Sequence, residues 1–167
     1  MVLDSMVPVP YLPDKGRMID LGSGAGFPAV IIKILKPDLD VILVESNGKK
    51  VSFLKYAIHT LKLTGIIPIN GRIETITEDV KALGFDLITS RAMTNLENII
   101  RISDPFLKVG GAVVGFLGRD GAKELKKIRE LLLDYNLALK DFITYRLPGK
   151  KAERTTVIIQ KESISNT

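Results

Sequence analysis

Short runs of branched apolar residues alternate along this chain with segments of helical periodicity, and this alternation is the strongest constraint on the fold. Arg17–Leu21 and Val41–Glu45 are two such runs, and a helix-like segment follows each of them. In the second helix-like segment, the apolar side chains on one face are Val51, Leu54, Ile58 and Leu61, and Gly65 ends the pattern. The alternation predicts βαβ units, and therefore a doubly wound α/β fold with a mostly parallel sheet.

The later segments extend this pattern and end in a hairpin. The further strands are predicted at Ile66–Ile69, Phe85–Thr89, Ala112–Leu117, Leu139–Leu147 and Thr155–Lys161. The further helices are predicted at Asn95–Leu107, closed by Gly110 and Gly111, and over 122–135. The last two strands flank the basic connection Pro148–Lys151, which predicts an antiparallel C-terminal edge. No repeat or linker divides the chain, so we expect one domain over 1–167, with residues 1–15 irregular.

Three glycines lie between the first predicted strand and the helix after it, where Pro28 suits the first helical turn. Glycine lets the backbone turn sharply and approach a ligand that a β-carbon would block. A dinucleotide site needs G-x-G-x-x-G, whereas here the order is Asp20, Gly22, Gly24, Gly26 at intervals of two. This acidic-x-G-x-G-x-G form resembles that of S-adenosylmethionine-dependent methyltransferases, in which a carboxylate at the loop can face the cationic methionine end of the cofactor.

Glu45 ends the second predicted strand, 23 positions after Gly22. In this type of fold, a carboxylate at that place accepts hydrogen bonds from ribose hydroxyls. A NAD enzyme would place the same residue there, so Glu45 supports an adenosine cofactor and leaves the choice of cofactor to the loop spacing. The alternative is an ordinary exposed acid at the end of a strand.

Four segments bear on the family of this chain: Asp20–Pro28, Glu45–Leu54, Gly71–Glu74 and Ser90–Ala92. Together they resemble the RsmG (GidB) family, and the likeness continues to Arg154. The strings E-S-N-G-K-K-x-x-F-L and S-R-A are more specific than the glycine loop. The resemblance implies a Rossmann-like class I methyltransferase that acts on guanine N7 in 16S ribosomal RNA of the small subunit. Family members usually carry a longer, mostly helical N-terminal part near the acceptor side, and Leu3–Met6 resembles the end of it.

Carried over by position, the resemblance implies cofactor contacts at Gly22, Phe27, Ile73, Glu74 and Arg91. Ile73 would pack on the adenine face, Glu74 would read the adenine edge, and Phe27 would cover the cofactor from the start of the helix. The alternative for Ile73 and Phe27 is packing in the core.

Arg91 follows Ser90 after a buried strand, at the edge of the sheet where open α/β proteins bind ligands. A fixed guanidinium there can order the active-site loop or donate to guanine O6, which makes Arg91 the candidate catalytic residue. The alternative is a structural ion pair with Glu74 or Asp86.

The chain carries 24 Lys and Arg against 19 Asp and Glu, and the net charge of +5 suits a polyanionic partner such as RNA. The candidate phosphate contacts are Arg72, Arg119, Arg146, Lys150, Lys151 and Arg154. The alternative for each is a solvated surface side chain.

The missing residue types also bear on the chemistry. Guanine N7 has a free lone pair at neutral pH, so its methylation needs no general base. The chain has no cysteine, which excludes the nucleophile of enzymes that methylate pyrimidine carbons. Ser90–Ala92 stands where exocyclic-amine methyltransferases carry an Asn/Asp-Pro-Pro-Tyr motif. His59 has no second His and no Cys beside it, so we expect a surface residue and no metal site.

Three other functions remain open at this level: methylation of a small molecule or a protein, nucleotide binding without catalysis, and NAD-dependent oxidation. The longest apolar stretches are far shorter than the roughly 20 residues that span a membrane. Asp4 stands where a signal peptide would carry basic residues. We therefore expect a cytoplasmic protein without a membrane segment, acting as a monomer.

Overall fold

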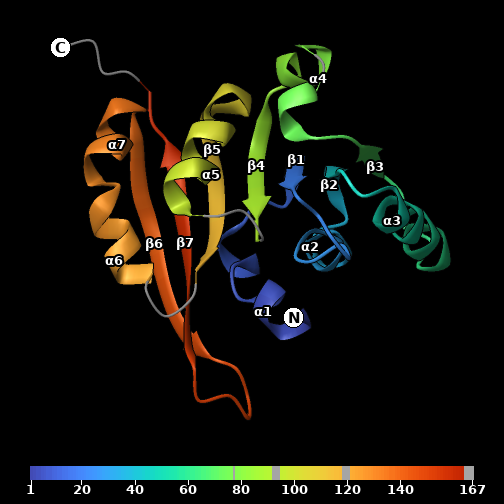
Figure 1. Ribbon diagram of the computed structural model, residues 1–167, viewed down its shortest axis with the longest axis horizontal. Helices are drawn as coiled ribbons and strands as arrows, with labels where there is room; N and C mark the ends of the chain where they lie inside the picture. The colour runs from blue at the N-terminus through green and yellow to red at the C-terminus, as the bar shows by residue number, and fades with distance from the viewer. Residues whose placement is uncertain (77, 92–94, 118–120, 164–167) are drawn as a thin grey trace.

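Seven strands form one sheet in the computed structural model, which describes residues 1–76, 78–91, 95–117 and 121–163 (Figure 1). The strands are β1 (Lys15–Leu21), β2 (Asp38–Glu45), β3 (Ile66–Asn70), β4 (Phe85–Ser90), β5 (Leu107–Leu117), β6 (Leu137–Arg146) and β7 (Glu153–Lys161). Their order is β3-β2-β1-β4-β5-β7-β6, with β1 to β5 parallel and β7 antiparallel to both of its neighbours. The predicted fold class is therefore confirmed, and the strand order reverses between β1 and β4, where such sheets bind ligands at their carboxyl edge.

Helices cover the two faces of this sheet. They are α1 (Val2–Met6), α2 (Ala29–Leu35), α3 (Gly48–Thr60), α4 (Glu78–Ala82), α5 (Leu96–Ser103), α6 (Gly121–Lys127) and α7 (Arg129–Asp134), with short 3-10 turns η1 (Val9–Tyr11), η2 (Ile73–Thr75) and η3 (Asp104–Phe106). Successive strand residues point to opposite faces, so Met18 and Leu87 pack with α2 and α3, whereas Ile19 and Ile88 pack with α5 and α7. Each large side chain buried in this way contributes about 1.5–3 kcal/mol to folding.

The structure differs from the sequence prediction at both ends of the sheet. Residues 1–15 were expected to be irregular, but they form α1 and η1, and β1 begins at Lys15. The helix expected over Asn95–Leu107 ends at Ser103, because Pro105 lies in the first turn of η3 and has no N–H to continue an α-helix. Gly110 does not end that helix. It lies inside β5 with φ +82°, beside a register shift between β4 and β5.

The helix predicted over 122–135 is two helices, α6 and α7, which meet at the buried Ile128. Pro28 precedes the first residue of α2 as its N-cap instead of lying in the first turn.

In the part of the chain described above, none of the helices has the length and apolarity needed to cross a bilayer. The hairpin of β6 and β7 extends past the other strands toward the side of the molecule where α1 lies (Figure 1).

Candidate functional site

The loop from β1 to α2 contains the three glycines, and all of them have positive φ. The angles are +73° at Gly22, +56° at Gly24 and +90° at Gly26. A Cβ at Gly26 would lie 2.6 Å from the Val30 Cγ2 atom, so a side chain there would collide with α2. At Gly24, the nearest neighbour of such a Cβ is a backbone oxygen 3.9 Å away, so this part of the loop is open. Only glycine satisfies both the backbone angles and the close packing of this turn.

Glu45 fastens this loop to the end of β2. Its Oε2 atom accepts a hydrogen bond of 2.8 Å from the Gly24 N–H, and Oε1 accepts one of 2.8 Å from the Asn47 N–H. The residue is 6% exposed, so it is not the exposed strand-end acid of the alternative interpretation. Each carboxylate oxygen can accept a second hydrogen bond, so Glu45 keeps acceptor capacity while it holds the loop.

A groove of about 350 Å³ lies at the carboxyl ends of β1, β2 and β3, within the size range of small-ligand sites. Its lining residues are Gly22, Val44, Glu45, Ser46, Gly71, Arg72, Ile73 and Glu74. Ile73 is 7% exposed and also belongs to the hydrophobic core, so core packing and groove lining coincide in this side chain. Glu74 is exposed beside it on η2. The structure thus brings four of the predicted cofactor residues into one groove.

Asp20 is buried in β1, two residues before the loop. Its Oδ1 atom accepts a 2.5 Å hydrogen bond from the Thr89 hydroxyl, whereas Oδ2 has no hydrogen-bond partner among the described residues. Burial raises the pKa of Asp20 to about 6, against the lowering effect of the nearby Thr89 and Ser23 hydroxyls, and the charge of Glu45 raises it further. An unpartnered carboxylate oxygen in such a place fits a cationic group on a bound molecule.

Phe27 is half-buried at the end of the glycine loop, directly before α2. It is not among the residues that line the groove. Its predicted position over a cofactor therefore stays a prediction.

Arg91 lies at the same edge of the sheet as the glycine loop. Ser90 pairs with Leu21 in the neighbouring strand, so Arg91 and Gly22 are the next residues of adjacent strands. The predicted alternative for Arg91, an ion pair with Glu74 or Asp86, is wrong. The Arg91 Nη2 atom pairs with Asp4 of α1 instead. Asp86 forms an ion pair with Lys108 Nζ at 3.0 Å and accepts a hydrogen bond from the Arg17 N–H.

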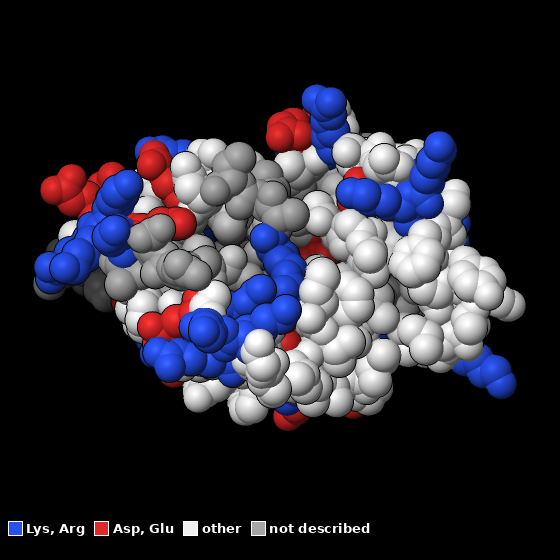
Figure 2. All heavy atoms as spheres, turned by 60° about the horizontal axis from the view of Figure 1, so that its bottom comes forward, with Lys and Arg blue, Asp and Glu red and all other residues white. Residues whose placement is uncertain are grey.

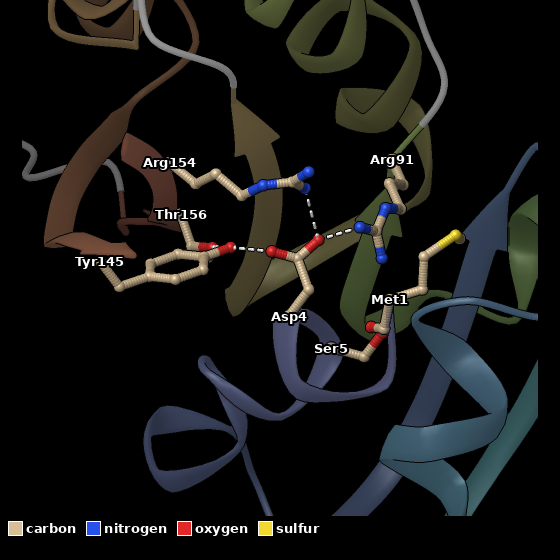
Figure 3. Close-up of polar contacts among 7 residues, drawn as sticks. All are labelled: Met1, Asp4, Ser5, Arg91, Tyr145, Arg154 and Thr156. Atoms are coloured by element: carbon tan, nitrogen blue, oxygen red, sulfur yellow. Dashed lines mark hydrogen bonds and ion pairs between the residues drawn. The ribbon is translucent and has the colours of Figure 1, made fainter. Parts of the chain in front are cut away.

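Asp4 lies at the centre of a polar group that we call the Asp4 cluster: Asp4, Arg91, Tyr145 and Arg154 (Figure 3). Asp4 Oδ2 also pairs with Arg154 Nη1 at 3.0 Å, and Oδ1 accepts a 2.5 Å hydrogen bond from the Tyr145 hydroxyl. The guanidinium of Arg91 lies 5.7 Å from the centre of the Phe116 ring. These side chains line a second cavity, of about 310 Å³.

The sequence predicted neither Asp4 nor Tyr145 as part of the site. The one signal for Asp4 is that it is the first charged residue in a mostly apolar N-terminal run.

The candidate phosphate contacts lie in three places. Arg72 is exposed at the groove, and Arg146, Lys150 and Lys151 are exposed at the end of the β6–β7 hairpin. Arg154 is part of the Asp4 cluster. Arg119, like Ala92 of the S-R-A string, lies outside the described residues. Figure 2, in which the bottom of Figure 1 comes forward, shows a group of Lys and Arg side chains near the middle of this face. His59 is exposed on α3, as predicted.

The sheet order, the glycine loop and the groove define a Rossmann-like S-adenosylmethionine-dependent methyltransferase of class I. Two solved structures share this fold. A methyltransferase from Pyrococcus furiosus has a TM-score of 0.77 at 16% identity and covers 97% of this chain and 83% of its own. The tRNA methyltransferase TrmK of B. subtilis has a TM-score of 0.73 at 18% identity and covers 96% and 66%.

The chain belongs to the GidB family, described as rRNA small subunit methyltransferase G, which matches residues 1–155. Two curated relatives are named Ribosomal RNA small subunit methyltransferase G. The one from Geobacter sp. (strain M21) is 33% identical over 158 residues, which are 95% of this chain and 72% of the relative. The one from Moorella thermoacetica is 37% identical over 164 residues, or 96% and 68%.

Proposed function

We propose that this chain transfers a methyl group from S-adenosylmethionine to N7 of a guanine in 16S ribosomal RNA of the small subunit. Its family and the names of its relatives support the RNA substrate. The observation that supports this cofactor is the glycine loop, which is bonded to Glu45 beside a groove and follows Asp20, whose Oδ2 atom has no partner among the described residues. Among the residues that the structure describes, nothing favours one of the other functions that the sequence left open.

The residues of the groove fit S-adenosylmethionine. Glu45 would accept hydrogen bonds from the ribose, Ile73 would pack against the adenine, and Glu74 would read the adenine edge. Asp20, and Phe27 at the end of the loop, would hold the methionine part, with the carboxylate of Asp20 near its ammonium group. When bound, the cofactor supplies a methyl group on a positively charged sulfur.

On the acceptor side, the chain has to orient the guanine, because N7 already holds the electron pair that forms the new bond. No side chain has to remove a proton from N7, so a general base is not needed. We assign Arg91 the role of donor to the guanine O6 atom, which lies next to N7 on the same base edge. Arginine remains protonated at neutral pH, so this donor does not titrate in the working range.

The exposed basic residues would contact the RNA backbone. Arg146, Lys150 and Lys151 at the hairpin, together with Arg72 at the groove, are placed for phosphate contacts that position the RNA without reading its sequence. We further propose that the chain works as a single-domain monomer in the cytoplasm. Gel filtration would test whether the chain is a monomer, and a single calorimetric unfolding transition would test whether it is one domain.

Thermal unfolding with added ligands tests the cofactor assignment. S-adenosylmethionine or S-adenosylhomocysteine at about 100 times its Kd should stabilise the chain by about 2.7 kcal/mol, because it binds only the folded state. The same concentration of NAD should do much less. Equal stabilisation by NAD would contradict our interpretation of the spacing of the glycines.

Salt dependence tests the RNA substrate. Affinity for 16S ribosomal RNA should fall steeply with added salt, because bound Lys and Arg displace counterions from phosphates. Replacing Lys150 and Lys151 with Ala should make the logarithmic slope shallower by about 1 to 2, the change expected for one or two lost phosphate contacts. RNA affinity that does not respond to salt would instead favour a small-molecule or protein substrate.

A further inference from the structure

We propose that Asp4 is a positioning residue for methyl transfer: it holds the guanidinium of Arg91 in a fixed orientation on the acceptor side of the site. Arg154 and Tyr145 complete this arrangement, because each donates a further hydrogen bond to the same carboxylate. The inference rests on the proposed function, because it gives Arg91 a role toward the target guanine.

The first support is the concentration of donors on one buried carboxylate. Asp4 is 1% exposed, and it is contacted by residues 87, 141 and 150 positions away in the chain. Two guanidinium groups share Oδ2, and the Tyr145 hydroxyl takes Oδ1 (Figure 3). Charge-assisted hydrogen bonds of this kind fix orientation as well as contribute energy.

The second support is the way in which α1 is attached. Its apolar side chains Val2, Leu3 and Met6 are exposed, while its buried residues are Asp4 and Ser5. An amphipathic helix normally buries its apolar side, so α1 places a carboxylate where stability alone would favour a hydrophobic residue. Buried ion pairs are weak stabilisers, because removing two charges from water offsets much of their attraction. The buried position of Asp4 is better explained by its ion pair with Arg91, which anchors the guanidinium.

The third support is the state of the Arg91 guanidinium itself. One terminal nitrogen is anchored by Asp4, and the group lies over the Phe116 ring. The other terminal nitrogen, Nη1, is buried without a hydrogen-bond partner among the described residues. Figure 3 shows it on the side of Met1, with no dashed contact to Asp4. A buried donor without a partner is unfavourable, so this atom is suited to a partner that arrives with the substrate.

Replacing Asp4 with Asn tests this role, with Asp104→Asn as the matched control because Asp104 pairs with Lys161 instead. Asp4→Asn should lower kcat by about tenfold or more and leave the Kd for S-adenosylhomocysteine within about twofold, because only the acceptor side is disturbed. The control should keep wild-type values. Unchanged kcat in folded Asp4→Asn protein would overturn the inference.

A double-mutant cycle separates positioning from a general loss of stability. In an Arg91→Lys background, Asp4→Asn should lower kcat by less than about threefold, because the group through which it acts is already changed. An equal fold-loss of kcat in both backgrounds would show a merely structural role.

If Asp4→Asn does not fold, Tyr145→Phe takes its place, since it removes one hydrogen bond to Asp4 and keeps the ring. It should lower kcat only when Arg91 is present.

A measurement without RNA distinguishes failure of this inference from failure of the proposed function. In nitrogen-15 spectra of the wild type, the Nη signals of Arg91 should be separate, because its bond to Asp4 slows rotation of the guanidinium. In Asp4→Asn they should merge. Merged signals in the wild type would overturn the positioning role, whatever the substrate. Separate signals in a wild-type protein that methylates no RNA would contradict the proposed function alone.

Discussion

The groove beside the glycine loop and the Asp4 cluster lie at the same edge of the sheet, but they are built in different ways. The groove consists of strand ends and the short segments that follow them, and backbone N–H groups bonded to Glu45 hold its loop. The Asp4 cluster consists of single side chains from α1, β6, β7 and the residue that follows β4. The groove is therefore determined by local sequence, whereas the Asp4 cluster depends on long-range packing. Substitutions in the two regions should affect different steps.

Arg91→Ala should give the largest effect, because it removes the donor on the acceptor side. We expect kcat to fall by about 100-fold or more, the scale of removing a donor that acts in the transition state. Folding stability should change far less than this loss implies. Steady-state kinetics and thermal unfolding measure the two quantities. The control is Arg101→Ala, at an exposed pair with Glu97, which should change neither. A loss of activity explained by unfolding would remove the distinction between the two regions.

Glu45→Ala should act on the cofactor side. It should weaken binding of S-adenosylhomocysteine by about 1.5–3 kcal/mol, the range for a hydrogen bond to a charged group. Because Glu45 also holds the Gly24 and Asn47 N–H groups, some folding stability should be lost as well. Calorimetric titration measures the affinity, and Asp14→Ala, at an acid with 87% side-chain exposure, is the control. Unchanged affinity would show that Glu45 holds the loop without contacting the cofactor.

Gly26→Ala tests whether the turn of the glycine loop needs glycine for packing as well as for its backbone angle. Gly110→Ala is the matched control, since Gly110 also has positive φ but a β-carbon there would meet no atom within 4 Å. Both substitutions should cost about 1 kcal/mol or more for the backbone angle. Gly26→Ala should cost a further 1–2 kcal/mol or so because of the contact with Val30. Equal midpoints in urea for the two variants would contradict the packing argument.

The pH dependence of cofactor binding gives the smallest effect. The pKa of Asp20 is raised from 3.8 to about 6, so folding favours the protonated carboxyl. This contribution to folding stability is fully present below pH 3.8 and is lost as the pH rises through about 6. A cationic ligand prefers the ionised form, so its affinity should fall as pH drops below 6, by about tenfold per unit at most. At saturating cofactor, kcat should stay nearly constant from pH 6 to 8. Asp20→Asn should abolish the pH dependence of affinity; a slope that persists in this variant would assign it to another group.

The sequence predicted the parallel strands, and four of the cofactor residues that it named lie in one groove, because the strands and the loop have local causes. Alternating apolar runs indicate strands, and glycines at intervals of two indicate a turn that a side chain would block. The elements that were predicted wrongly depend on contacts outside their own segment. Gly110 resembles a helix stop, but it lies in a strand because Phe85 pairs with Leu107. α1 was not predicted, because it is held by Asp4 and its apolar residues are exposed.

The candidate site divides in the same way. Gly22, Glu45, Ile73 and Glu74 were predicted and lie together in one groove. The partner of Arg91 was not predicted, since no periodicity connects residue 91 with a residue 87 positions earlier. A lone acid in an apolar segment reveals its partner only when the chain is folded.

Chemical cleavage specific for N7-methylguanine tests the central claim most directly. 16S ribosomal RNA, as free RNA and in small subunits, would be taken from cells that lack the enzyme. It would then be treated with the purified protein and S-adenosylmethionine. We predict strand scission at one guanine after treatment with the wild type, and none above background after treatment with Arg91→Ala. Methyl incorporation on an exocyclic amine, a ribose hydroxyl or a pyrimidine, without this scission, would contradict the claim even if cofactor binding were confirmed.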